Sequence, residues 1–280
     1  MVRYAKYVVP DLALLGIGTH RIIRKKVENK KSFKWLNHVR KETPKSGKFI
    51  ASDKTGTEVL FEWVKTDANS PDFSLTMKSI ADITGESFAP VEVKFLRAHP
   101  DLVFKEMYYK PFEPLFKDGV ENVDWKCVEE KMKSYIKSFH EIDASKISAD
   151  DLYFFVKAKN KENGVLLGII IYFLNPYYRY GDVKVINIAV KTEARNRGLG
   201  KLLMSSIFNI VPEIKRMFLT TRVTNDIAIN AYRRWGFTKD LNPIQQPHAF
   251  NLDHWIALQY NPQACDVLQK VAAKLKKESE

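Results

Sequence analysis

One segment constrains the fold of this chain more than any other. It is a strand-like run that ends in a basic, glycine-containing turn and continues as a helix-like segment. Residues 185–190 read Val-Ile-Asn-Ile-Ala-Val, and residues 191–201 read Lys-Thr-Glu-Ala-Arg-Asn-Arg-Gly-Leu-Gly-Lys. Glycines at 198 and 200 let a ligand approach the backbone closely. The first N–H groups of a helix lack intrahelical partners and carry partial positive charge. The segment therefore predicts a strand, a tight loop and a helix N-terminus that bind an anion such as a diphosphate.

A second segment, residues 225–237, strengthens this interpretation. Asn225 precedes an apolar pattern with helical spacing, so we expect it to cap a helix, and Gly236 is placed to end that helix. Taken alone, the glycines at 198 and 200 are equally well explained as ordinary turn residues. The inference of a ligand site therefore depends on the two segments together.

The two segments together resemble the Gcn5-related N-acetyltransferase (GNAT) family. The acetyl-CoA motif of that family, Q/R-x-x-G-x-G/A, is met by Arg195, Gly198 and Gly200. Its next motif, N-x-x-A-x-x-x-Y-x-x-x-G-F, is met by Asn225, Ala228, Tyr232, Gly236 and Phe237. The resemblance implies an α/β (α+β) GNAT fold, in which a mixed, mostly antiparallel sheet splays at the acetyl-CoA site between flanking helices. It also implies an N-acetyltransferase.

The resemblance also implies roles for the residues of the site. The backbone at 188–190 would lie along the pantetheine arm and offer an oxyanion donor, residues 196–201 would hold the diphosphate, and Asn225 would contact the arm. The implied cofactor-binding residues are Ile188, Ala189, Val190, Arg195, Asn196, Arg197, Gly198, Leu199, Gly200, Lys201, Asn225 and Tyr232. The co-substrate is acetyl-CoA, and we expect no metal because the histidines show no metal-ligand spacing.

Tyr232 is the candidate general acid. In many GNAT enzymes a tyrosine at this position protonates the departing CoA thiolate, and a phenol is a workable donor to a thiolate. The alternative is a ring packed in the core with its hydroxyl on a nearby carbonyl. The motif favours the catalytic role.

No general base can be assigned from the sequence. The motifs are most similar to bacterial ribosomal-protein alanine acetyltransferases, which carry a base glutamate on the strand before the asparagine. The matching position here is Thr220, which cannot act as that base. Three alternatives remain. They are a water that relays the proton through Thr220 and Asn187, the carboxylate of Glu193, and a residue of the N-terminal extension.

The acceptor site of the family lies between the first helical loop and the late hairpin. Its implied residues here include Tyr108, Tyr109, the aromatic turn 175–180 and residues 248–254. The candidate substrate residues are Tyr108, Tyr178, Asn187 and Thr220. The tyrosines are equally compatible with packing at the rim of a site.

The expected organisation has three parts. Residues 1–89 form a basic extension or small domain of unknown role, residues 90–262 the acetyltransferase domain, and residues 263–280 a C-terminal amphipathic helix. Within the middle part, we expect strands at 91–96, 152–158, 165–174, 185–190, 217–223, 237–241 and 254–259. Helical segments are expected at 108–116 and 123–139, with a hairpin turn at Asn163-Gly164.

Charge is concentrated at the N-terminal end. Residues 1–50 hold 13 Lys/Arg and 3 Asp/Glu, so they contribute +10 of the net +12. A basic segment can bind nucleic acid or anionic surfaces. A solvated helix whose apolar side docks on the neighbouring domain is the favoured interpretation of residues 21–36.

Two cysteines fit a reducing compartment better than a disulfide scaffold. The sequence has no run near the ~20 apolar residues of a membrane span. We therefore expect a cytoplasmic protein, with a mitochondrial location left open by the basic start.

The leading hypothesis is acetyl transfer from acetyl-CoA to a primary amine of a small molecule or protein. The alternatives are a CoA-binding module with little catalysis, and an acetyltransferase docked on RNA through residues 1–50. Neither the acceptor nor the oligomeric state follows from the sequence.

Overall fold

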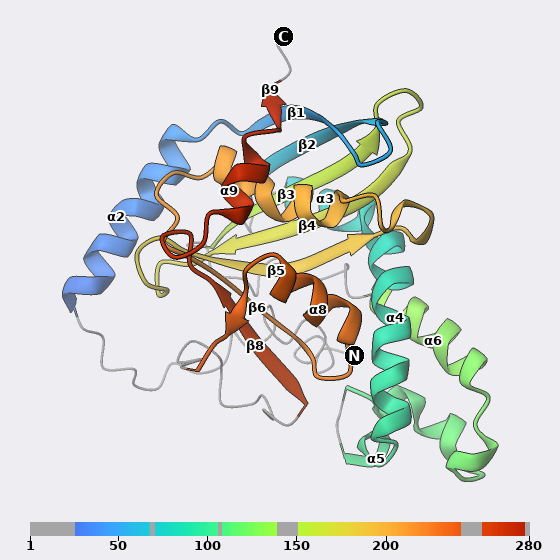
Figure 1. Cartoon of the computed structure of the whole chain (residues 1–280). Coiled ribbons are helices and arrows are strands. Elements are labelled where there is room, and N and C mark those ends of the chain that lie inside the picture. The colour runs from blue at the N-terminus through green and yellow to red at the C-terminus, as the bar shows by residue number, and fades with distance from the viewer. Residues whose placement is uncertain (1–25, 68–70, 106–107, 139–150, 242–253, 278–280) are drawn as a thin grey trace.

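The computed structural model describes residues 26–67, 71–105, 108–138, 151–241 and 254–277. Its strands form one sheet in the order β7-β8-β6-β5-β4-β3-β2-β1-β9 (Figure 1). The strands are β1 (Ser46–Ser52), β2 (Glu58–Asp67), β3 (Leu152–Asn160), β4 (Leu166–Leu174), β5 (Asp182–Val190), β6 (Arg216–Arg222), β7 (Thr238–Lys239), β8 (Trp255–Tyr260) and β9 (Lys276–Lys277). The pairing is antiparallel except between β5 and β6. The expected mixed, mostly antiparallel sheet is confirmed.

Helices flank the sheet. The α-helices are α2 (Lys26–Glu42), α3 (Pro71–Ser79), α4 (Ala81–Ala98), α5 (Leu102–Lys105), α6 (Trp125–Ser138), α7 (Leu199–Ser206), α8 (Asp226–Arg234) and α9 (Val267–Ala272). Short 3-10 helices are η3 (Lys110–Phe116), η4 (Val120–Asn122), η7 (Thr192–Ala194) and η8 (Ile207–Asn209). The helical segments expected at 108–116 and 123–139 correspond to η3 and α6.

Both faces of the central strands are buried. Along β3, Phe154 and Val156 pack into one apolar cluster, whereas Tyr153 and Phe155 pack into another on the opposite face. The first cluster also contains side chains of α2, α7 and α9, and the second contains side chains of α3 and α4. Burial on both faces explains why β3 and β4 read as nearly continuous apolar runs.

The strand expected at residues 91–96 is wrong, because these residues lie inside α4. Ala89, Val93 and Leu96 have the i, i+4, i+7 spacing that buries one helix face, and all three pack in the same cluster. The alternation of apolar and polar residues at 91–94 resembled a strand because four residues cover only about one helical turn, which is too short to distinguish the two periods. The first strand that leads into the helices is β2 instead.

The N-terminal part of the described chain is integrated into the sheet. β1 pairs with β2, and β2 pairs with β3 over its whole length. The boundary expected after residue 89 falls within α4. Trp35, Leu36 and Val39 of α2 are buried in the main cluster, which agrees with a helix docked by its apolar side. Residues 1–25 of the basic segment lie outside the described residues.

The C-terminal helix is shorter than expected. Only Val267–Ala272 is helical, and Lys276–Lys277 then pairs with β1 as the edge strand β9. Leu268 and Leu275 bury their side chains in the main cluster, and Leu275 extends the chain toward this edge. The expectation of one amphipathic helix over residues 263–280 is therefore wrong for residues 273–277, and residues 278–280 lie outside the described residues.

Candidate functional site

The strands β5 and β6 separate after three residue pairs. They pair in parallel at Asp182–Lys184 and Arg216–Phe218 and nowhere further along (Figure 1). β4 continues to pair with β5 up to Val190, with a register shift beside Ile186. From Val185 onward, β5 therefore pairs with a described strand on one edge only. Its other edge offers backbone N–H and C=O groups to a ligand, as an extended amide chain requires.

The open edge of β5 leads directly into the predicted loop. The chain passes through η7 and Asn196, whose φ is +63°, to Gly198, whose φ is +85°. Gly198 is the N-cap of α7, and its carbonyl accepts the first helical hydrogen bond, from the N–H of Lys201 at 3.1 Å. The amides of Leu199 and Gly200 precede that bond, so they are available to an anion. The predicted strand, loop and helix N-terminus are confirmed.

Side chains pack closely against both glycines. A Cβ at Gly198 would lie 3.3 Å from Cγ of Lys54, and a Cβ at Gly200 would lie 3.1 Å from Cη2 of Trp235. Gly198 also needs its left-handed backbone conformation. The two motif glycines are therefore required by the folded loop, and Trp235 joins the first motif to the helix of the second.

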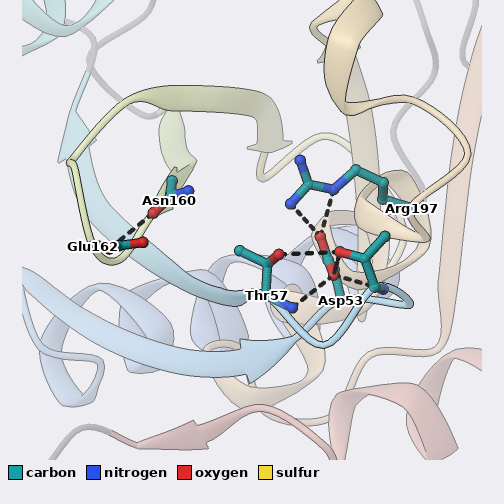
Figure 2. A network of polar contacts seen from close by, with 6 residues as sticks. Asp53, Thr57, Asn160, Glu162 and Arg197 are labelled. Atoms are coloured by element: carbon teal, nitrogen blue, oxygen red, sulfur yellow. Dashed lines mark hydrogen bonds and ion pairs between the residues drawn. The ribbon is translucent and has the colours of Figure 1, made fainter.

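The three cations of the loop have different surroundings. The guanidinium of Arg197 donates from Nε to Oδ2 of Asp53 at 2.6 Å, and its Nη2 forms an ion pair with the same oxygen at 2.5 Å (Figure 2). Arg195 donates from Nε to the carbonyl of Val190 at 3.2 Å. Lys201 is half-buried and makes no ion pair with any residue that the structure describes. Arg197 therefore contributes to the loop through an ion pair with a distant hairpin.

Helix α8 ends as the second motif predicts. Gly236 has a φ of +96° and donates its N–H to the carbonyl of Arg233 at 3.0 Å, while Phe237 donates to Tyr232 at 3.0 Å. This pair of bonds is a Schellman motif. It places the rings of Trp235 and Phe237 each 5.6 Å from the ring of Tyr232.

The Tyr232 side chain is buried, yet its hydroxyl has no hydrogen-bond partner among the described residues. The ring therefore packs in the main cluster, as the alternative predicts, but its hydroxyl does not donate to a carbonyl of the described residues. Burial raises the pKa of Tyr232 well above its ordinary value. The phenol therefore keeps its proton throughout the neutral range, as a proton donor must.

Asn225 does not cap α8 with its side chain. It occupies the N-cap position, and its backbone carbonyl accepts from the N–H of Ile229 at 3.0 Å. Its side-chain Nδ2 donates instead to Oγ1 of Thr221 at 3.0 Å. The predicted side-chain cap is therefore wrong, because β6 supplies a competing acceptor. The amide oxygen of Asn225 accepts no bond from the described residues.

A buried polar network lies beside the far end of β6. Arg222 donates to both carboxylate oxygens of Glu92, at 3.0 and 2.9 Å, and to the hydroxyl of Tyr109 at 2.8 Å. Tyr109 in turn donates to Glu92 at 2.6 Å. Burial opposes the charge of Arg222, but the adjacent Glu92 outweighs burial and raises the pKa of the guanidinium. The network joins α4, the segment before η3, and β6.

Aromatic rings enclose this network. The guanidinium carbon of Arg222 lies 4.1 Å from the ring centroid of Phe95 and 4.0 Å from that of Trp255. Phe95 also contacts His99 and His254, at 4.7 and 5.1 Å between ring centroids. The helical loop and the late hairpin expected to form an acceptor site therefore meet here. Residues 248–253 lie outside the described residues.

The four candidate substrate residues do not all lie together. Asn187 on β5 and Thr220 on β6 are half-buried and border the separated strands. Tyr178 packs its ring on Phe218 at 5.2 Å. Tyr108 lies in another layer, with its ring 4.7 Å from that of Tyr109.

The candidates for the general base also differ in their surroundings. Glu193 is exposed and lies 4.0 Å from the ammonium of Lys191, within the loop. Glu92 is buried, but its three hydrogen bonds from Arg222 and Tyr109 occupy it as an ion-pair partner. Glu193 thus stays a candidate on the exposed loop, and Thr220 and Asn187 border the separated strands.

Sequence reasoning missed Asp53, Lys54, Glu92 and Arg222. The first two occupy an Asp-Lys-Thr-Gly-Thr segment between alternating apolar residues, which is a recognisable turn signal. Glu92 was hidden by the mistaken strand at 91–96, and Arg222 carries no local signal.

Comparisons with known proteins agree with this geometry. Residues 118–237 match the family model described as acetyltransferase (GNAT) family. Among curated proteins, none matches the chain.

Solved structures with partial similarity include three acetyltransferases. Nourseothricin acetyltransferase is 25% identical, with a TM-score of 0.30, and the match covers 40% of this chain and 65% of that one. The ribosomal-protein-S18-alanine N-acetyltransferase from Escherichia coli is 21% identical, with a TM-score of 0.30 and coverages of 42% and 73%. The PaiA N-acetyltransferase from Thermoplasma acidophilum, in complex with coenzyme A, is 14% identical, with a TM-score of 0.39 and coverages of 72% and 98%.

These superpositions cover only part of each chain, so the likeness to the family rests on the family model and on the two motifs within its range. None of the described helices has the length and apolar character of a membrane span, and no cluster of His, Cys, Asp or Glu among the described residues has the arrangement of a metal site. Both motifs, the separated strands and the helix N-terminus fall within residues 118–237, the part of the chain that matches the acetyltransferase (GNAT) family model.

Proposed function

We propose that the protein transfers the acetyl group of acetyl-CoA to a primary amine of a small molecule or protein. The observation that carries this proposal is the edge of β5 that faces β6, which has no strand partner among the described residues from Val185 to Val190 and leads to the amides of α7. An extended chain with amide groups and a diphosphate at one end is complementary to that edge and loop. Acetyl-CoA would supply the activated acetyl group.

The geometry of these residues supports a role for each part of the donor. The backbone of residues 188–190 would hydrogen-bond the pantetheine arm in the manner of an added strand. The amides of Leu199 and Gly200, with the positive end of α7, would hold the diphosphate. An amide of the same β5 edge would stabilise the oxyanion that forms at the thioester carbonyl.

Tyr232 is our candidate for the proton donor. In the proposed step the amine nitrogen bonds to the thioester carbon, the carbon–sulfur bond breaks, and the departing thiolate takes the phenol proton. Burial makes the phenol a weaker acid, so a hydrogen bond to the developing thiolate is the larger part of its contribution. The amine loses its proton to water held between Asn187 and Thr220, in the absence of a suitable carboxylate on β6.

A test of this function combines binding and turnover. Calorimetry with CoA should give a saturable isotherm, and incubation with acetyl-CoA and grouped amine acceptors should release free CoA. No CoA binding at millimolar concentration would overturn the proposal. CoA binding without turnover on any amine group would instead support a CoA-binding module, the alternative suggested by Thr220 at the position of the base glutamate.

A further inference from the structure

The tip of the β1–β2 hairpin lies directly against the loop between β5 and α7, residues 191–198, which we call the diphosphate loop after its proposed ligand. The N–H of Lys54 donates to the carbonyl of Arg197 at 3.0 Å. The adjacent Asp53 accepts a hydrogen bond from Nε of Arg197 and forms an ion pair with its Nη2 (Figure 2). Backbone and side chain of Arg197 are thus both held by a segment that lies outside the two family motifs and outside residues 118–237.

The two carboxylate oxygens of Asp53 have separate tasks. Oδ1 accepts from the N–H and hydroxyl of Thr55, at 2.8 and 2.6 Å, and from the N–H of Thr57 at 3.1 Å. Among the described residues, Oδ2 accepts only from Arg197. The carboxylate is 0% exposed, so its charge depends on these partners. Burial opposes the charge, but the hydrogen bonds from Thr55 and Arg197 outweigh it and lower the pKa of Asp53.

The loop needs such support because its backbone is unfavourable. Asn196 and Gly198 on either side of Arg197 both have positive φ, at +63° and +85°. A left-handed conformation at a residue other than glycine persists only where its surroundings hold it. The hairpin contacts both the side chain and the carbonyl of the residue between these two positions.

Lys54 lies along the exposed side of the same loop. Its Cγ, Cδ and Cε are 3.3–3.6 Å from the position that a Cβ on Gly198 would take. Its ammonium makes no ion pair with the described residues, unlike the guanidinium of Arg197. The aliphatic stem therefore crosses the glycine, and the ammonium is left to interact with a ligand at the start of α7.

We propose that this hairpin is part of the donor site, with Asp53 as a positioning residue that holds the diphosphate loop through Arg197 and with Lys54 as a cation for the phosphates of acetyl-CoA. The inference rests on the proposed function. Arg197, which the sequence assigned to the phosphates, is occupied by Asp53, and Lys54 supplies the positive charge in its place.

The decisive variant is Asp53→Asn. Asparagine keeps an acceptor at Oδ1 for Thr55 and Thr57, so the hairpin turn is retained, but it replaces Oδ2 with an N–H₂ group that faces the Arg197 donors. We expect the Kd for CoA, measured by calorimetry, to rise about tenfold, the scale of one charge-assisted contact. An unchanged or lower Kd would overturn the positioning role, because it would mean that CoA binding does not depend on the contact between Asp53 and Arg197.

A shortened donor separates positioning from general damage. Acetyl-pantetheine carries the thioester but lacks the diphosphate, so Asp53→Asn should leave its kcat/KM unchanged while lowering that for acetyl-CoA. An equal loss with both donors would overturn the proposal in favour of a purely structural role. If the wild-type protein itself fails to bind CoA, the proposed function fails instead, so the two outcomes are distinguishable.

Lys54→Ala tests the cation, with Lys48→Ala as the matched control on the exposed part of β1. Removal of one exposed cation from a phosphate contact should weaken CoA binding about three- to tenfold, and the control should not change it. Dephospho-CoA, which lacks the 3′-phosphate, identifies the contact. A defect that persists with dephospho-CoA places Lys54 at the diphosphate, and a defect that disappears places it at the 3′-phosphate. Equal CoA affinity in Lys54→Ala and Lys48→Ala would refute the role of Lys54.

Discussion

The two ends of the site are built in different ways. The donor end consists of one continuous segment, residues 185–203, in which a strand, a loop and a helix follow each other directly. The end at which an acceptor site is expected contains a buried network of Glu92, Tyr109, Arg222 and His254, which come from four separate segments. The donor end would bind through backbone groups, whereas buried side chains form the network at the other end.

This difference explains why the donor can be inferred and the acceptor cannot. Backbone groups that hold a diphosphate require glycines at fixed spacing, and such spacing is visible in the sequence. Side chains brought together by tertiary packing leave no local pattern. The hairpin contact at Asp53 shows that even the donor end has one long-range component, which the motif did not reveal.

The largest expected effect concerns the acceptor end. Arg222→Met would leave Glu92 buried without its cation, and breaking such a pair costs about 3–5 kcal/mol of unfolding free energy. Urea denaturation followed by tryptophan fluorescence measures this loss. Arg233→Ala, an exposed arginine on α8, is the control.

Replacing both partners provides a sharper test of the same pair. The double variant Glu92→Leu with Arg222→Met removes both charges, so much of the stability should return. A single variant Arg222→Met that loses less than about 1 kcal/mol would contradict the account of this network, since it would resemble a surface pair.

The next effect concerns the donor end. Gly198→Glu forces a side chain into a left-handed backbone position and brings a carboxylate to the diphosphate. We expect CoA affinity to fall about a hundred- to a thousandfold, or about 3–4 kcal/mol. Gly164→Glu is the control, because Gly164 also has a positive φ, of +70°, but lies in the distant β3–β4 turn. Similar CoA affinities for the two variants would show that the loop at Gly198 does not take part in donor binding.

A smaller effect tests the chemistry between the two ends. Tyr232→Phe keeps the ring contacts with Trp235 and Phe237 but removes the proton donor. Turnover should fall about a hundredfold, the lower part of the range for general acid catalysis, because burial makes this phenol a weak acid. The Kd for CoA should change little. Equal kcat values for Tyr232→Phe and wild type would remove Tyr232 from this role.

The smallest effect is a pH dependence at the hairpin. Asp53 has a lowered pKa in the folded protein, so its contribution to stability is complete above about pH 4 and is lost as the pH falls through the folded value. Asp53→Asn should therefore be less stable than wild type by about 1–2 kcal/mol at pH 7. That difference should shrink at pH 3, as measured by urea denaturation. A difference that stays constant with pH would show that the charge of Asp53 is not involved.

Particular residues show what the sequence could predict. The segment 185–203 and the helix that ends at Gly236 were predicted correctly, because turns and caps are set by local backbone requirements. The alternation at 91–94 was misleading, since one turn of an amphipathic helix can mimic a strand, and the burial of α4 by tertiary packing decided the outcome. Asn225 was predicted to cap α8, but Thr221 on the neighbouring strand provided another partner.

Hydrogen exchange tests the central claim that the donor occupies the separation between β5 and β6. Amide exchange would be measured with and without saturating CoA. We predict slower exchange at the amides of residues 185–190 that point toward β6, and at Leu199 and Gly200, with no change at residues 153–156 of β3. CoA binding that leaves residues 185–190 and 199–200 unprotected, or protects a different region, would contradict the account.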